Sequence, residues 1–448
     1  MKEAETIVAL STPQGEGAIG IIRLSGPNAV KLTARHTNAS LLNAAANSAV
    51  FSRFRINEVI LDEVVVTIFK APKSYTGEDV CEISFHGSAF ILNQALEALL
   101  ESGARLATPG EFTQRAFLNG KMDLSQAEAV ADLIASESEA EHRLAMHQMR
   151  GGFSREIAQL RQELINFTSL IELELDFAEE DVEFANRDQL KALIQKIQAY
   201  IQKLVDSFRY GNAVKQGVPV AIIGQPNAGK STLLNLLLND DKAIVSEIAG
   251  TTRDAVEDIC IVEGIRFRFI DTAGIRETTD IIEAIGVKKS LEKMRGAAIV
   301  IYLFDARESK EEHIGVLDKL NLEMDPATVV IAVANKIDLS DKSALADIQL
   351  SAKTGEGLDQ LRRLLVDSIK TGSVKSGDVV VTNARHLQAL KATGIALDAA
   401  LHGIESGLSG DLVSSDIREA LHQLGSITGE ISAEELLGNI FGKFCIGK

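Results

Sequence analysis

The residues with the clearest chemistry form a glycine-rich loop in the middle of the chain. An apolar run at 218–223 leads into GQPNAGKS at 224–231, and a helical pattern follows. In this strand, loop and helix order, the glycines let successive backbone N–H groups surround phosphate oxygens. Lys230 can reach the outer phosphates, and the Ser231 hydroxyl can ligate Mg²⁺. The sequence therefore predicts a nucleoside triphosphate site with contacts from Asn227, Ala228, Gly229, Lys230, Ser231 and Thr232.

A second segment supplies a carboxylate for the same site. The sequence IDTAG at 270–274 follows an apparent hairpin strand. Its carboxylate can hold the hydration shell of Mg²⁺, and its glycine amide can meet the γ-phosphate. The predicted contacts are Asp271, Thr272, Ala273 and Gly274.

Two further segments identify the base. The apolar run 329–334 ends at Asn335-Lys336, with Asp338 close behind, and another short apolar stretch ends at Ser351, Ala352 and Lys353. Taken alone, Asn335 and Asp338 are also typical of a turn after a strand. The Asp338 carboxylate can accept both N–H donors on the edge of guanine, which adenine does not offer. With four elements in the required order, the sequence predicts GTP binding.

The polar run 250–254, Gly-Thr-Thr-Arg-Asp, lies between the loop and Asp271. This is where such proteins carry the threonine that senses the γ-phosphate. Ras-type hydrolysis commonly uses a Gln after the DxxG glycine to orient the attacking water, but here that residue is Ile275. Another polar group or a partner must replace it, and the nearby candidates are Arg253, Arg276, Glu277 and Glu283. The motif order resembles the translation-factor-related GTPases of the Ras-like superfamily.

Composition places the chain among ordinary globular proteins. Its 448 residues predict about two to four folded units, and 46% are hydrophobic. The formal net charge of −17 argues against a protein that coats nucleic acid. Three separated cysteines offer neither a disulfide framework nor a zinc cluster and fit a reducing cytoplasm. No export signal is visible, and no stretch approaches the roughly 20 apolar residues of a membrane span.

Long proline-free tracts predict a helical domain on both sides of the nucleotide-binding segment. One tract separates Pro109 from Pro219, and the other follows Pro326. Apolar residues at spacings of three and four predict two helices before the nucleotide loop, with faces formed by Phe153, Ile157, Leu160, Leu164, Phe167 and Ile171, and by Leu190, Leu193, Ile197, Ile201, Leu204 and Phe208. The acidic run 176–183 between them is typical of a helix end or a solvated turn rather than a metal site.

These patterns predict a multidomain protein. Residues 1–118 form an α+β domain, in which 63–69 and 80–85 are strands, and Cys81, Ile83 and Phe85 mark the apolar face of the second. Residues 119–216 and 373–448 form one all-α domain from two chain segments. Residues 217–372 form an inserted α/β domain with a mostly parallel sheet, because apolar runs at 218–223, 298–304 and 329–334 alternate with helical patterns.

The whole chain also resembles the MnmE, or TrmE, family of tRNA modification GTPases. Beyond the nucleotide motifs, the resemblance rests on four segments and on the ending FCIGK. These segments are AIGIIRLSG at 18–26, YTGEDV at 75–80, PGEFTQRAFLNGK at 109–121 and TNARH at 382–386. Generic GTPases carry none of them, so the match is specific.

The resemblance implies an enzyme that works with the flavin-dependent partner MnmG. Together the two proteins install an aminomethyl or carboxymethylaminomethyl group at carbon 5 of the wobble uridine of certain tRNAs. The amino-terminal domain of the family binds a formyl- or methylene-tetrahydrofolate and forms a constitutive homodimer, which joins MnmG in a heterotetramer. By residue matching, the folate contacts are Arg23, Glu82, Lys121 and Lys448.

Family members also pair their G domains across the nucleotide when K⁺ is present. The matching K⁺ ligands are the Asn227 side chain and the backbone oxygens of Ser246, Ile248 and Thr251, with Ser231 and Thr252 on Mg²⁺. Glu283 matches the glutamate that positions the water. The remaining implied nucleotide contacts are Glu247, Ala249 and Gly250.

Cys445 lies beside a residue implied in folate binding, and its thiolate could attack the uridine ring or the one-carbon unit. Two other functions remain open at this point. A ribosome-assembly GTPase would have no use for the folate residues, and a GTP-dependent dimeric scaffold would not need Cys445.

Overall fold

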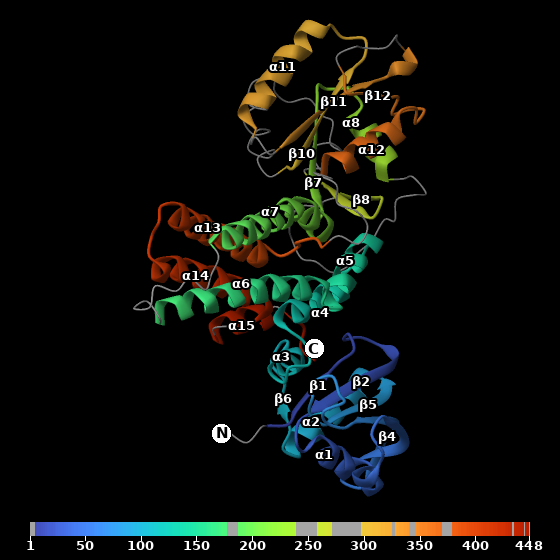
Figure 1. Cartoon of the computed structure of the whole chain (residues 1–448). Helices are drawn as coiled ribbons and strands as arrows, with labels where there is room; N and C mark the ends of the chain where they lie inside the picture. The colour runs from blue at the N-terminus through green and yellow to red at the C-terminus, as the bar shows by residue number, and fades with distance from the viewer. Residues whose placement is uncertain are drawn as a thin grey trace. The chain divides into compact units, whose positions relative to one another are not determined.

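The computed structural model of the chain describes residues 5–176, 187–238, 258–270, 297–324, 328–339, 346–369, 379–431, 434–442 and 444–447 (Figure 1). They belong to two compact units. The first comprises Met1–Ala131, Gln148–Gln162 and Leu421–Lys448, and the second comprises Asp132–His147 and Glu163–Ala420.

A six-stranded sheet forms the centre of the amino-terminal domain, with strand order β3-β4-β5-β2-β1-β6. Neighbouring strands are antiparallel except for the pair of β1 and β6. Helices α1 and α2 pack against one face, where their apolar residues share a core with β2, β4 and β5. The element bounds are β1 Ile7–Leu10, β2 Gly17–Ser25, α1 Ala29–His36, η1 Ala39–Asn43, β3 Ser48–Ile56, β4 Val59–Phe69, β5 Val80–Gly87, α2 Ala89–Glu101 and β6 Arg105–Leu106.

Strand β5 alternates as predicted. Cys81, Ile83 and Phe85 are buried, whereas His86 on the other face is exposed. That other face of the sheet, the open face, carries large apolar side chains at Ile19 and Phe51, which are 64% and 66% exposed. The predicted α+β domain is confirmed.

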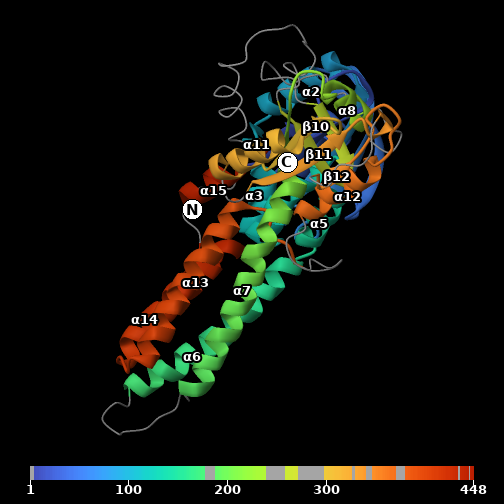
Figure 2. The ribbon, with the colours of Figure 1, turned by 90° about the horizontal axis from the view of Figure 1, so that it is seen from above.

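The helical part of the chain comprises eight helices among the described residues. Their bounds are α3 Glu111–Leu118, α4 Leu124–Ala135, α5 Glu139–Met149, α6 Gly152–Asp176, α7 Arg187–Gln216, α13 Ala384–Glu405, α14 Gly410–Thr428 and α15 Glu434–Phe441. Helices α7 and α13, which precede and follow the α/β domain, lie side by side (Figure 2). Gln198 on α7 donates to the Asp398 carboxylate on α13 at 2.6 Å. The insertion of the α/β domain between two helical segments is therefore confirmed.

The buried faces of α6 and α7 differ in detail from the predicted ones. Phe167 is only half-buried in α6, whereas Thr168 is buried. In α7, Ile194 and Ser207 are buried in place of Leu193 and Phe208. The predicted spacing identified the helices but missed some residues of the buried face. Residues three and four positions apart lie on one face of a helix, and the packing of neighbouring helices determines which of them are fully buried. Of the acidic run 176–183, only Asp176 lies within the described residues, at the end of α6.

The inserted domain contains a second six-stranded sheet, ordered β12-β11-β10-β7-β9-β8, in which only β8 runs antiparallel to its neighbour. Strand β10 is buried throughout. Ile299, Ile301 and Leu303 face the core shared with α8 and α12, whereas the alternate residues face α11. The bounds are β7 Val218–Ile223, α8 Lys230–Leu238, β8 Asp258–Val262, β9 Ile265–Phe269, β10 Ile299–Asp305, α11 Lys310–Glu323, β11 Val329–Asn335, η3 Ile337–Leu339, β12 Ile348–Gln349 and α12 Leu358–Ile369.

Helices therefore cover both faces of a mostly parallel sheet, as predicted. In the described parts of the chain, no helix is long and apolar enough to cross a bilayer. The same residues contain no cluster of three or more His, Cys, Asp or Glu side chains that could hold a metal ion.

Candidate functional site

The glycine-rich loop connects the end of β7 to the start of α8 at Lys230. Gly224 has φ of +153°, and a Cβ atom there would lie 2.0 Å from the Leu303 carbonyl oxygen on β10. Gly229 has φ of +100°, and its Cβ atom would lie 2.3 Å from the Asn335 side-chain nitrogen. Only glycine fits either position, so the loop backbone can bend tightly enough to point N–H groups inward.

Lys230 is folded back over this loop. Its ammonium group donates to the carbonyl oxygens of Gly224 at 2.8 Å and Gln225 at 2.9 Å. Burial lowers the pKa of the Lys230 ammonium. The cation is thus held at the loop that would receive the phosphates.

Asn335 joins the three loops of the predicted site. Its side-chain amide donates to the Ala228 carbonyl at 2.7 Å, and its side-chain oxygen accepts from the Ala352 N–H at 2.9 Å. The residue is 2% exposed. Because the carboxyl ends of parallel strands meet at one edge of the sheet, residues far apart in the sequence converge at Asn335.

Lys336 and Asp338, which follow Asn335 closely in the sequence, are also held by polar contacts. Lys336 has φ of +67°, and its ammonium pairs with the Asp305 carboxylate at 2.9 Å. Asp338 accepts a hydrogen bond from the Ser351 hydroxyl at 2.7 Å. The Arg307 hydrogen bond, reinforced by Lys336 and opposed by burial, lowers the pKa of Asp305, so Lys336 faces a permanent anion.

The other predicted loop residues lie at different depths. Ala228 is buried, Ser231 is half-buried, and Asn227, Thr232 and Lys353 are exposed. Asn227 has φ of +64°. This left-handed conformation is uncommon for a residue other than glycine, although Asn adopts it more readily than most.

Several predicted nucleotide and metal residues lie outside the described residues. They are Ser246, Glu247, Ile248, Ala249, Gly250, Thr251, Thr252, Asp271, Thr272, Ala273, Gly274 and Glu283. The earlier candidates for orienting water, Arg253, Arg276 and Glu277, lie outside as well.

The amino-terminal domain brings Arg23 and Glu82 together. They occupy paired positions on β2 and β5, and the Arg23 guanidinium donates to Glu82 at 2.9 Å from Nε. Both side chains are partly exposed, at 22% and 25%. Since the cation and the carboxylate already pair, a ligand that uses them must share the pair rather than meet two free charges.

The carboxyl-terminal segment also reaches Arg23. The Gly447 carbonyl accepts hydrogen bonds from Arg23 at 3.5 Å and from the Ser11 hydroxyl at 3.3 Å. Gly447 has φ of +96°, and a Cβ atom there would lie 2.2 Å from the Leu10 carbonyl oxygen. Close contact with β1 therefore requires glycine at this position.

The remaining residues of the predicted folate site have different placements. Lys121 donates to the Pro72 carbonyl at 2.9 Å, at the start of the 72–79 loop. Cys445 is exposed, whereas Cys81 and Cys260 are buried. Lys448 lies outside the described residues.

Sequence reasoning missed several residues that build these sites. The Arg23 guanidinium lies 5.6 Å from the centre of the Tyr75 ring and 5.7 Å from that of Phe112. Both aromatic residues belong to segments that carried the family resemblance, so the signal was present without an assigned role. The acid at the end of β10, Asp305, was also missed, and its position at a strand terminus was the available clue.

Comparison with known proteins covers nearly the whole chain. Residues 6–121 match the family model described as GTP-binding protein TrmE N-terminus, and residues 124–445 match the MnmE helical domain. A tRNA modification GTPase MnmE from Cytophaga hutchinsonii is 55% identical and covers 99% of this chain and 98% of its own length. Another from Christiangramia forsetii is 50% identical, with both chains covered completely.

Among solved structures, the G domain of the FeoB iron transporter from T. maritima covers 34% of this chain and 99% of its own length. It is 24% identical to this chain, with a TM-score of 0.26.

Proposed function

The chain belongs to the MnmE family of tRNA modification GTPases, and we propose that it helps to modify carbon 5 of the wobble uridine in certain tRNAs. The product is a carboxymethylaminomethyl or aminomethyl group, made together with the flavin-dependent partner MnmG. The observation that carries this proposal is that one chain holds both the nucleotide loops joined by Asn335 and the Arg23–Glu82 pair beside the carboxyl-terminal segment.

The chain is a GTPase. We propose the following roles for the described part of its nucleotide site. The loop before α8 offers backbone N–H groups to the phosphates, and Lys230 offers an ammonium group. Asp338, oriented by Ser351, accepts the two N–H donors of guanine. The Asn335 side chain, through its hydrogen bonds to Ala228 and Ala352, holds the phosphate-binding loop beside the loops that recognise guanine.

We assign Mg²⁺ to Ser231 and Thr252, and K⁺ to Asn227, Ser246, Ile248 and Thr251. The described members fit this role, because Ser231 lies in the first turn of α8 and Asn227 is exposed on the same loop. Bound cations supply positive charge that offsets the negative charge of the phosphates. Glu283 orients the attacking water, a role that Ile275 cannot fill.

The Arg23 region is assigned to a formyl- or methylene-tetrahydrofolate. This carrier has an anionic glutamate tail and a pterin edge with N–H donors, which suit a guanidinium and a carboxylate respectively. Arg23, Glu82, Lys121 and Lys448 would make these contacts. Cys445 is exposed beside this site and is the candidate nucleophile.

A homodimer, joined by MnmG in a heterotetramer, is the proposed assembly. The exposed Phe51 is paired with Val65 across β3 and β4, and Ile19 adds a third apolar group to the open face. Exposed large apolar side chains on one face of a sheet favour protein contact. We propose that the open face contributes to the homodimer.

Steady-state GTP hydrolysis in K⁺ and in Na⁺ at equal ionic strength tests the G-domain mechanism. We expect strong stimulation by K⁺ together with G-domain pairing, and loss of the stimulation in Asn227→Ala. The control is Asn235→Ala, which changes an exposed asparagine on α8. Equal rates in the two salts for the unchanged protein would refute the K⁺ mechanism.

Equilibrium binding of formyl-tetrahydrofolate tests the carrier site. We expect Arg23→Ala to abolish measurable binding, whereas Arg35→Ala, which removes an exposed arginine from α1, retains it. Absence of binding to the unchanged protein would remove the folate assignment.

Transfer RNA modification by Cys445→Ser, assayed with MnmG, tests the nucleophile. Full modification by this variant would show that Cys445 is not the nucleophile.

A further inference from the structure

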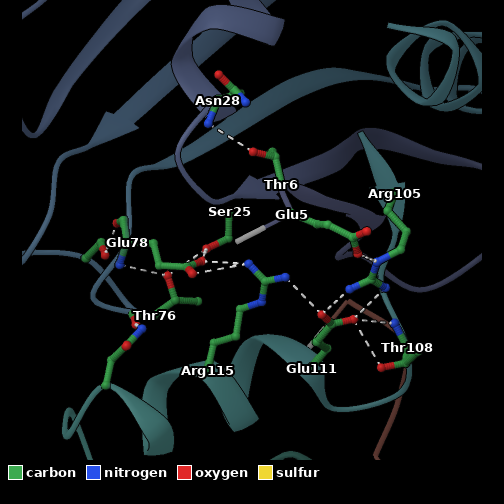
Figure 3. A network of polar contacts seen from close by, with 12 residues as sticks. Glu5, Thr6, Ser25, Asn28, Thr76, Glu78, Arg105, Thr108, Glu111 and Arg115 are labelled. Atoms are coloured by element: carbon green, nitrogen blue, oxygen red, sulfur yellow. Dashed lines mark hydrogen bonds and ion pairs between the residues drawn. The ribbon is translucent and has the colours of Figure 1, made fainter. Parts of the chain in front are cut away.

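A network of charged side chains connects α3 to β6, to the 72–79 loop and to the end of β2 (Figure 3). Its centre is Glu111, the first residue of α3. Its carboxylate accepts hydrogen bonds from the Thr108 backbone N–H at 2.9 Å and from the Arg115 guanidinium at 3.0 Å, and it also pairs with Arg105. Glu111 therefore ties β6 and the turn at 108–111 to the next turn of α3.

Arg115 extends the network to the 72–79 loop. Its guanidinium pairs with Glu78 at 3.0 Å as well as with Glu111. Glu78 also accepts from the Ser25 hydroxyl at 2.7 Å, at the end of β2. Arg115 thus uses its fork of N–H donors to hold two carboxylates from different segments.

The central side chains have little contact with solvent. Those of Glu111 and Arg115 are 10% and 13% exposed, and that of Glu78 is 20% exposed. Taking ionic groups out of water is costly, so such a network is weak evidence for stability. Removing Glu111 takes one of two carboxylate partners from Arg115, which keeps Glu78, and from Arg105, which keeps Glu5. The links between these segments and α3 are then lost, so the network constrains their geometry.

Two of the anchored segments contribute aromatic rings to the surroundings of Arg23. The 72–79 loop supplies Tyr75, and α3 supplies Phe112, so their rings flank the guanidinium. Tyr75 is fixed further by a 2.9 Å hydrogen bond between its hydroxyl and that of Thr113 on α3.

The turn at 108–111 supplies the anchor for the carboxyl-terminal segment. Gly110 has φ of +68°, and its N–H donates to the Cys445 carbonyl at 3.3 Å. A Cβ atom at Gly110 would lie 2.6 Å from the Phe441 carbonyl oxygen, so the segment packs directly on this turn. The Glu111 contact to Thr108 stabilises the turn that presents this N–H group.

We propose that Glu111 and Arg115 are positioning residues for the carrier site, acting through Tyr75, Phe112 and Gly110. They fix the two rings beside Arg23 and hold the carboxyl-terminal segment, including Cys445, against the domain. The inference rests on the proposed role of Arg23 in binding a folate carrier.

The test uses the full-length chain and two measurements on Glu111→Gln. Binding of formyl-tetrahydrofolate should weaken about tenfold, because the Tyr75 and Phe112 rings and the carboxyl-terminal segment lose the contacts of Glu111 that hold them in place. A nitroxide label on Cys445, the exposed cysteine among three, should become more mobile at a temperature where the protein stays folded. A network that only stabilised the fold would lower the unfolding temperature and leave both measurements unchanged.

Two further variants complete the test. Glu97→Gln makes the same chemical change at an exposed position of α2 and should match the unchanged protein in both measurements. Arg115→Lys keeps the charge but loses the fork, so it should weaken binding less than Glu111→Gln does. If Glu111→Gln does not fold, the same two measurements on Arg115→Lys test the proposal: weaker carrier binding and a more mobile label support it, and unchanged values overturn it.

Unchanged affinity in the folded variants would overturn the positioning role, whether or not the label moves. If the unchanged protein itself does not bind the carrier, the proposed folate function fails. The mobility of the label on Cys445 then still tests whether the network holds the carboxyl-terminal segment. A label that is no more mobile in Glu111→Gln than in the unchanged protein would overturn this role of the network.

Discussion

The side-chain amide of Asn335 donates a hydrogen bond to the Ala228 carbonyl at 2.7 Å, across 107 positions of sequence. Its other end accepts from Ala352, so one buried side chain sets the spacing of three loops. A buried amide without hydrogen-bond partners costs free energy, so the contacts of Asn335 stabilise the relative positions of these loops.

Asn335→Ala should therefore impair nucleotide binding strongly. The change leaves the Ala228 carbonyl and the Ala352 N–H without the Asn335 side chain as partner, at a cost of about 1–3 kcal/mol, or roughly fivefold to a hundredfold in affinity. Titration with a fluorescent GDP analogue measures the effect, with Asn235→Ala as the exposed control. A dissociation constant within twofold of the unchanged protein would show that Asn335 does not organise the site.

Asp305→Asn should weaken guanine nucleotide binding by a smaller factor. The Lys336 ammonium would lose its anionic partner and the constraint on its position, while Asn335 and Asp338 stay in place. We expect a loss of about threefold to tenfold, as for a partly buried charged hydrogen bond. Calorimetric titration with GDP measures it, and Asp318→Asn on the exposed side of α11 is the control. Equal affinities for the two variants would contradict the role of Asp305.

Gly224→Ala should prevent formation of the phosphate-binding loop. The added methyl group would lie 2.0 Å from the Leu303 carbonyl oxygen on the central strand, and φ of +153° is already unfavourable for alanine. We expect loss of GTP binding with a lower unfolding temperature. Gly315→Ala on α11, where a Cβ atom meets nothing within 4 Å, should have little effect. Normal GTP binding by Gly224→Ala would mean that the loop can move away from β10.

The contribution of Glu111 to stability should depend on acid pH. Burial alone would raise the pKa of Glu111, but hydrogen bonds from Arg105, Thr108 and Arg115 outweigh it and lower the pKa to about 2 from an ordinary 4.5. The ionised form is therefore favoured in the folded state, and its contribution is complete above pH 4.5 and disappears as the pH falls toward 2.

This shift corresponds to at most about 3 kcal/mol at neutral pH. Urea unfolding of the unchanged protein and of Glu111→Gln at several pH values should show a stability difference that narrows between pH 4.5 and pH 2. A difference that stays constant over this range would contradict the assignment of the shift to Glu111.

The sequence by itself determined the main features of the architecture. Strand β7 has the predicted bounds, because its short apolar run is bounded by Gly217 and Gly224 and can be recognised from local sequence. The alternation of Cys81, Ile83 and Phe85 identified the buried face of β5 for a similar reason. The order of the nucleotide motifs identified the base and the class of enzyme, since the chemistry of phosphate and guanine restricts the residues that can meet them.

Only the tertiary structure decided how these residues meet. No local pattern indicates that Asn335 contacts Ala228, that Arg23 is already paired with Glu82, or that Gly110 anchors Cys445. These contacts join segments that are distant in the chain, and they form only where strand ends converge or where the carboxyl terminus returns to β1 and α3. The sequence identifies the groups that can do chemistry, whereas long-range packing determines which of them are adjacent and which charged groups form ion pairs.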